Sequence, residues 1–150
     1  MDLRDLPSFT LRRATHLLDR VADRLLQREF GLSYSLFLVL LALADGGRAK
    51  QTDIADSLDV SRASITARVR ELGRRGLVAV CQSAEDPRAN TVALSPEGER
   101  LLGAAWAALE NEPDGLEAGV DIDGLAAQLD ILIAKAQRHL EHREARRAAH

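Results

Sequence analysis

Residues 61–78 read Ser-Arg-Ala-Ser-Ile-Thr-Ala-Arg-Val-Arg-Glu-Leu-Gly-Arg-Arg-Gly-Leu-Val, and this stretch decides the predicted fold. Its apolar residues Ile65, Val69 and Leu72 recur at helical spacing, which predicts a helix that starts after the cap Ser61 and closes at Gly76. The preceding segment 51–58 predicts a helix of about two turns. Two short helices joined by a tight turn are typical of a helix-turn-helix motif.

Two strand-like runs follow this motif. They are Leu77 to Gln82 and Thr91 to Leu94, and between them lies a turn-rich segment that contains Asp86 and Pro87. This pattern predicts a β-hairpin whose tip lies in the segment 83–90.

Two helices are predicted before the motif. The first starts at Pro7-Ser8, with Ser8 as its expected cap, and ends near Gly31. The second starts near Ser33 and continues through the apolar run to Ala44. Because this second helix is apolar on nearly every side, it is predicted to be central and buried.

Two more helices are predicted after the hairpin. One opens with Ser95-Pro96-Glu97, a cap followed by proline at the first helical position, and runs past Trp106. The last starts near Asp121 or Asp123 and carries an apolar seam from Leu125 to Leu140 that suits packing on another helix. The predicted fold class is mainly α with a small β-hairpin wing.

The face of the 61–76 helix opposite its apolar stripe carries small and basic side chains. Small residues near the N-terminus let a helix approach the bases of a DNA major groove, where hydroxyls and arginines bind base edges or phosphates. A purely structural surface helix more often carries Glu–Lys pairs; a solvated helix face is nevertheless the alternative. The candidate DNA contacts on this helix are Ser61, Arg62, Ala63, Ser64, Thr66, Ala67, Arg68, Arg70 and Arg74.

The element order and two motifs resemble the multiple-antibiotic-resistance regulator (MarR) family of winged-helix transcription factors. Residues 61–78 look like its recognition helix running into the first wing strand. Asp86-Pro-Arg88 followed by residues 91–98 looks like its wing signature. The resemblance spans about residues 8 to 143. It implies a single domain, 1–150, in which a DNA-binding lobe (33–95) is flanked by a helical dimerisation base (8–32 and 96–145).

The resemblance also implies roles for particular residues. Arg88 is expected to enter the DNA minor groove while Asp86 holds its side chain, although Asp-Pro is also an ordinary turn former. Gln51 and Thr52 are expected to contact phosphates. Lys50 stands where the family commonly has a threonine cap, and Ala67 where it often has arginine, so the operator sequence does not transfer from relatives.

The family further implies a homodimer, a pseudo-palindromic DNA site and, usually, repression. Many members release DNA when a small aromatic or phenolic compound binds between the helical base and the DNA-binding lobe. The expected pocket residues are His16, Tyr34, Phe37 and Trp106, which lie near the expected helix junction; ordinary core packing is the alternative for each.

Composition and charge fit a soluble, cytoplasmic protein with no membrane span. Of the 150 residues, 46% are apolar and 29% charged, with a net charge of −3. The charge is unevenly distributed along the chain. The segment from Ser61 to Gly76 contains five arginines and one glutamate, whereas the segment 109–124 contains six acidic residues and no basic one.

Two other classes of function remain open. The single cysteine, Cys81, would serve an oxidant sensor, although burial as a small apolar residue is the expectation. A winged-helix module that binds protein and not DNA is the other. No catalytic grouping, cofactor loop or complete metal-ligand set is evident, so no enzymatic activity, cofactor or metal is expected.

Overall fold

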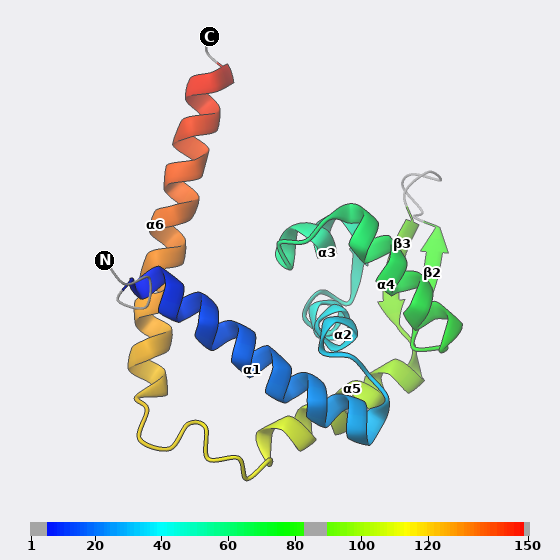
Figure 1. The fold of residues 1–150 in the computed structure, drawn as a ribbon. Helices are drawn as coiled ribbons and strands as arrows, with labels where there is room; N and C mark the ends of the chain where they lie inside the picture. The colour runs from blue at the N-terminus through cyan, green and yellow to red at the C-terminus, as the bar shows by residue number, and fades with distance from the viewer. Residues whose placement is uncertain (1–5, 83–89, 149–150) are drawn as a thin grey trace. The chain divides into compact units, whose positions relative to one another are not determined.

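The computed structural model describes residues 6–82 and 90–148, with side chains over 6–81 and 91–142. The elements are α1 (Pro7–Phe30), α2 (Tyr34–Gly46), β1 (Arg48–Lys50), α3 (Gln51–Ser57), α4 (Arg62–Arg74), β2 (Val78–Gln82), β3 (Asn90–Leu94), α5 (Pro96–Glu110) and α6 (Ile122–Ala148) (Figure 1). The chain divides into two compact units, residues 1–112 and 113–150. The predicted fold class, mainly helical with a small β wing, is confirmed.

Helix α2 forms the centre of the first unit, as its composition predicts. Phe37, Val39, Leu40 and Leu43 are buried, and α2 contacts α1, α3, α4, α5 and the sheet (Figure 1). Its N-cap is Ser33, whose hydroxyl accepts the Leu36 N–H at 3.3 Å. Burial of a nearly all-apolar helix is the main hydrophobic contribution to this unit.

The wing strands pair as predicted, but the sheet has a third strand that the sequence did not reveal. Strand β3 lies in the middle, antiparallel to β2 on one side and to β1 on the other. Val92 in β3 is fully buried and pairs with Val80 of β2 and Ala49 of β1. The three residues of β1 are Arg-Ala-Lys, which lack any β-branched or aromatic side chain, so no local pattern marks them as a strand.

The first helix differs from its prediction at one end. Helix α1 begins at Pro7, and Leu6 occupies the N-cap position with no side-chain hydrogen bond. The expectation that Ser8 caps the helix is therefore wrong, because Pro7 takes the first helical position and places Ser8 inside. The C-terminal end agrees with the prediction: Gly31 adopts a left-handed conformation with φ 57°.

The corner between α1 and α2 is fixed by polar contacts and by packing. The carboxylate of Asp23 on α1 accepts the Tyr34 N–H at 2.8 Å, and this satisfies a donor in the first turn of α2. Burial of Tyr34 raises the pKa of its phenol above the ordinary value, and the negative charge of Asp19 adds to this.

Helix α5 starts against the turn that follows α4. Its cap Ser95 accepts the Gly98 N–H at 3.0 Å, donates its hydroxyl to the Gly76 carbonyl at 2.6 Å, and donates its N–H to the Leu77 carbonyl at 3.0 Å. A Cβ at Gly98 would overlap the Leu77 carbonyl oxygen, so only glycine allows this close approach.

The second unit consists of a turn-rich segment and α6. The carboxylate of Asp121 accepts the Gly124 N–H at 3.0 Å, which confirms Asp121 as the start of the last helix. Helix α6 carries exposed apolar side chains, among them Leu125, Leu132 and Leu140. No single helix in the described part of the chain is long and apolar enough to cross a bilayer, although α1 and α2 pass that test together across an 88° bend.

We predict that Gly98→Ala destabilises the protein by about 1–3 kcal/mol, because the added methyl group overlaps backbone that cannot retreat cheaply. Gly103→Ala on the same helix is the matched control. Its Cβ meets nothing within 4 Å, so alanine is expected to stabilise the helix by up to about 1 kcal/mol. Urea unfolding of both variants measures the difference; equal effects would contradict the close packing at Gly98.

The pKa of Tyr34 gives a second prediction. Because the folded state holds the phenolic proton more firmly, Tyr34 contributes stability that is present below pH 10.0 and lost as pH rises through its folded pKa. Tyr34 is the only tyrosine, so phenolate absorbance reports it alone. We expect a midpoint above 10.0 in the native protein and a lower one in urea.

Asp19→Asn tests the cause of this shift. The substitution should lower the native midpoint only in part, because burial has the larger effect. Identical midpoints in native and unfolded protein would refute the burial of this phenol.

Candidate nucleic-acid interface

Helix α4 presents the face that its sequence pattern predicts. Ile65, Val69 and Leu72 are buried in the core, and Ser61 caps the helix by accepting the Ser64 N–H at 3.2 Å. The opposite face is open to solvent. It carries Arg62, Ala63, Thr66, Ala67, Arg70 and Arg74, whereas Ser64 and Arg68 on its flanks are half-buried.

The turn between α3 and α4 holds the two helices close together. Asp59 adopts a left-handed conformation with φ 50°, which aspartate tolerates better than most residues. The Val60 N–H then donates to the Ala55 carbonyl at 3.0 Å. Helix α4 leaves this turn with its first residues exposed.

A hydrogen bond joins two of the candidate DNA-contacting residues, Thr66 and Gln51, which the sequence gave no reason to pair. The Thr66 hydroxyl on α4 donates to Oε1 of Gln51 at the start of α3, at 3.0 Å. This bond fixes the Gln51 side chain and leaves its amide NH₂ as a donor. Because the two residues are fifteen positions apart, only the packing of α3 on α4 brings them together. Thr52 donates to Asp53 at 3.3 Å, which directs its hydroxyl along α3.

The arginines of α4 and its end have different partners. Arg74 pairs with Glu71 one turn earlier on the same helix. Arg75, just beyond the helix, donates to the carbonyls of Gly31 and Phe30 at the end of α1. No local pattern in the sequence signals this contact of Arg75, because its partners lie more than forty positions earlier in the chain.

The wing residues Asp86 and Arg88 lie outside the described residues. Strands β2 and β3, which flank them in the chain, pair antiparallel from Val78–Leu94 to Gln82–Asn90. Cys81 in β2 is partly exposed, so the expectation that it is buried is wrong. Its backbone carbonyl accepts the Thr91 hydroxyl at 3.3 Å.

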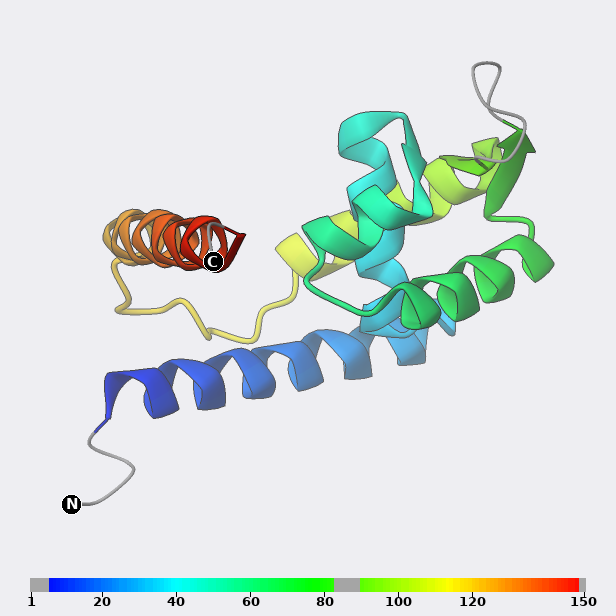
Figure 2. The ribbon, with the colours of Figure 1, turned by 90° about the horizontal axis from the view of Figure 1, so that it is seen from above.

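Three of the four expected pocket residues form a stack of aromatic rings. The centroids of Tyr34 and Phe37 lie 6.1 Å apart, and those of Phe37 and Trp106 lie 6.4 Å apart. Phe37 is buried, whereas Trp106 is 44% exposed. The fourth, His16, is exposed on α1. The N-terminal part of α1 extends beyond the other helices of the first unit (Figure 2).

An apolar hollow of about 300 Å³ lies beside Trp106, between α2, β3 and α5. Leu41, Leu94 and Leu102 line it, and so does the charged residue Glu99. Of the expected pocket residues, Trp106 alone lines this hollow. Among the described residues, no group of three or more His, Cys, Asp or Glu is placed to hold a metal ion.

Residues 30–89 match the model of the MarR family. No curated protein matches the chain.

Solved structures of transcriptional regulators have the same fold. The transcriptional repressor CouR, bound to a 23-mer DNA duplex, is 27% identical with a TM-score of 0.77; 89% of this chain and 94% of that one are covered. The regulator MOSR of M. tuberculosis, in complex with DNA, is 25% identical with a TM-score of 0.73, covering 89% and 98%.

BldR from Sulfolobus solfataricus is 24% identical with a TM-score of 0.78, covering 84% of this chain and 91% of that one. The solved structures agree with the mostly helical fold and its small three-stranded antiparallel sheet. The chain is therefore similar to the MarR family over residues 30–89 and shares the fold of winged-helix transcriptional regulators.

Proposed function

We propose that this protein is a homodimeric repressor that binds double-stranded DNA by inserting α4 into the major groove. The observation that carries the proposal is the exposed face of α4, which is small at Ala63 and Ala67 and positively charged at Arg70. Small side chains let the helix backbone approach the base edges, and arginine binds guanine or phosphate. The likeness to CouR, which was solved on a DNA duplex, supports this reading.

The polar groups near the start of α4 are suited to contacts in the groove. The bond from Thr66 to Gln51 leaves the Gln51 amide NH₂ to donate to a base or phosphate. Arg62, Ser64 and Arg68 complete the proposed contacts along the helix, with Ser61 and Thr52 at the phosphates. We extend the proposal to Arg88 in the minor groove, held by Asp86, because a guanidinium favours the negative potential there.

The homodimer is supported by apolar side chains that each unit leaves exposed. On α1 they are Phe9, Leu11, Leu17, Leu18 and Val21, and on α6 they include Leu125, Ile131, Leu132, Ile133 and Leu140. Apolar surface of this extent usually marks an interface. In the proposed single domain, 8–32 and 96–145 form the dimerisation base and 33–95 the DNA-binding lobe. A two-fold dimer would bind half-sites about one helical turn apart on a pseudo-palindrome.

Release by a small aromatic ligand is the proposed regulation. The stacked rings of Tyr34, Phe37 and Trp106, with the apolar hollow beside Trp106, offer aromatic and apolar surface between α2 and α5. A ligand bound there would favour a lobe arrangement that fits DNA poorly and so shift the population away from the bound form. As a DNA-binding regulator, the protein would act in the cytoplasm.

We predict that Arg70→Ala and Arg88→Ala each weaken binding to the DNA upstream of the protein's own gene by roughly 1–3 kcal/mol, because each removes a contact in a groove. Fluorescence anisotropy against that duplex and a scrambled one, at several salt concentrations, measures the loss. Wild-type affinity is expected to fall steeply with added salt. Arg100→Ala on α5, which removes an exposed arginine paired with Glu97, is the control for charge alone.

Equal, weak binding of the wild type to both duplexes, unaffected by either substitution, would contradict DNA binding at this site. The alternative function, a winged-helix module that binds protein and not DNA, would then be favoured.

The dimer gives a separate prediction. Leu18→Asp places a charge among the exposed apolar residues of α1 and should convert the dimer to monomers, because burying an unpaired carboxylate costs several kcal/mol. Gln27→Glu adds the same charge at an exposed polar position of α1 and should leave the dimer intact. Sedimentation velocity distinguishes the two, and a dimeric Leu18→Asp protein would exclude this face from the interface.

A further inference from the structure

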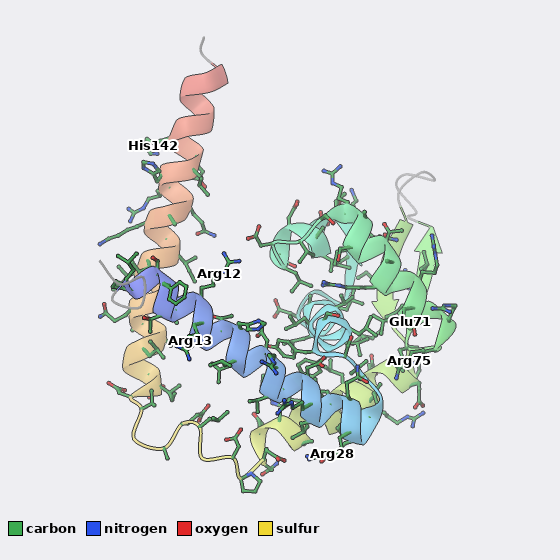
Figure 3. The ribbon with its side chains drawn as sticks, viewed as in Figure 1. Arg12, Arg13, Arg28, Glu71, Arg75 and His142 are labelled. Carbon is green, nitrogen blue, oxygen red and sulfur yellow. The ribbon has the colours of Figure 1, made fainter. Side chains whose placement is uncertain are left out.

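One arginine fastens the end of α4 to the end of α1. Nη1 of Arg75 donates to the Gly31 carbonyl at 3.1 Å, and Nη2 donates to the Phe30 carbonyl at 3.4 Å. Arg75 is half-buried and lies directly after the last residue of α4, near Glu71 of the same helix (Figure 3). The bonded residues are more than forty positions apart in the chain.

The end of α1 needs such a donor. The N–H groups of Gly31 and Leu32 already bond to the Gln27 and Leu26 carbonyls, but the last carbonyls of a helix have no partner within it. Arg75 supplies donors to two oxygens at this end, and its positive charge faces the negative end of the helix dipole. The planar guanidinium serves both oxygens at once, which a lysine ammonium on a flexible stem does less well.

The same turn is held on its other side by α5. Gly76 has φ 70°, its carbonyl accepts the Ser95 hydroxyl, and the Leu77 carbonyl accepts the Ser95 N–H. The residues just after α4 are thus bonded to α1 and to α5. The direction of α4 relative to both helices depends on this turn.

The neighbouring arginine shows that this arrangement is specific to position 75. Arg74 is exposed and pairs with Glu71 of its own helix, so it ties α4 to nothing else among the described residues. The guanidinium N–H groups of Arg75 instead donate to backbone carbonyls of the protein. Arg75 is therefore poorly placed to neutralise a phosphate.

We infer that Arg75 is a positioning residue that fixes the angle between α4 and α1 and thereby selects the spacing of the two DNA half-sites. The inference rests on the proposed function, in which α1 belongs to the dimer base and α4 enters the groove. In a two-fold dimer, a change in the angle at one end of α4 moves both recognition helices and alters the distance between them. Arg75 therefore governs which spacing is bound and does not itself contact DNA.

The test uses duplexes that the wild-type protein selects from a randomised library, remade with the spacer between half-sites lengthened or shortened by one or two base pairs. The wild type is expected to prefer one spacing. In Arg75→Ala the ratio of affinities between the best and adjacent spacings should fall by about five- to tenfold, because the substitution removes both hydrogen bonds from the guanidinium to the end of α1. Arg75→Lys keeps the positive charge but loses the planar guanidinium, so its ratio of affinities should lie between those of the wild type and Arg75→Ala.

Salt dependence separates positioning from phosphate contact. The slope of log affinity against log salt should be unchanged in Arg75→Ala, whereas loss of a phosphate contact lowers it by about 0.9. Arg100→Ala removes the same charge elsewhere and should alter neither slope nor spacing preference. A lowered slope with an intact spacing preference in Arg75→Ala would overturn the inference.

If the wild type selects no duplex, the proposed function is refuted, but the role of Arg75 in fixing the angle between α4 and α1 can still be tested without DNA. Spin labels are placed on α1 and α4 by Arg13→Cys and Gly73→Cys in a Cys81→Ser background, and labelled chains are diluted with unlabelled ones. Both positions are exposed, and a Cβ at Gly73 meets nothing within 4 Å.

Arg75→Ala should broaden or shift the distance distribution between the labels while circular dichroism shows the helices retained. An unchanged distribution in the folded variant would overturn the inference.

Discussion

Helix α2 is apolar on nearly every side, and a helix of this kind is stable in water only when other elements enclose it. The rest of the first unit meets this constraint: α1, α3, α4, α5 and the sheet all pack on α2. The buried residues of α4, Ile65 and Leu72, belong to the same core. The requirement to cover α2 therefore also anchors one face of α4 and leaves the opposite face for solvent.

Polar contacts at the ends of the helices give this apolar core a defined geometry. Asp23 fastens the start of α2 to α1, Arg75 fastens the end of α4 to the end of α1, and Ser95 with Gly98 fastens α5 to the turn after α4. Each contact satisfies a backbone group that its own helix leaves without a partner. The area of apolar surface buried does not by itself fix a direction, so these hydrogen bonds, together with the fit of the packed side chains, specify the angles between helices. In the proposed dimer, those angles set where the two copies of α4 meet DNA.

Local patterns predicted the features that depend on neighbours in sequence. The caps Ser61 and Ser95, the start of α2 near Ser33, the buried stripe of α4 and the burial of α2 all followed from spacing and side-chain chemistry. Predictions failed where a local signal was absent or was overridden. Pro7 displaced the expected cap Ser8, β1 is a strand only because β3 pairs with it, and Cys81 is partly exposed in the wing. His16 has the right position on α1 by sequence, but that turn of the helix is exposed.

Helical periodicity and capping chemistry act over a few residues, so local patterns were enough to predict the order of the helices and the face of α4 that carries Ala63, Ala67 and Arg70. Which distant groups meet depends on the tertiary packing. It paired Thr66 with Gln51, stacked Tyr34, Phe37 and Trp106, and directed Arg75 to α1 while Arg74 stayed on its own helix. These contacts join residues far apart in the chain, and the packing of whole helices around α2, which no short pattern encodes, brings them within hydrogen-bonding distance or ring contact.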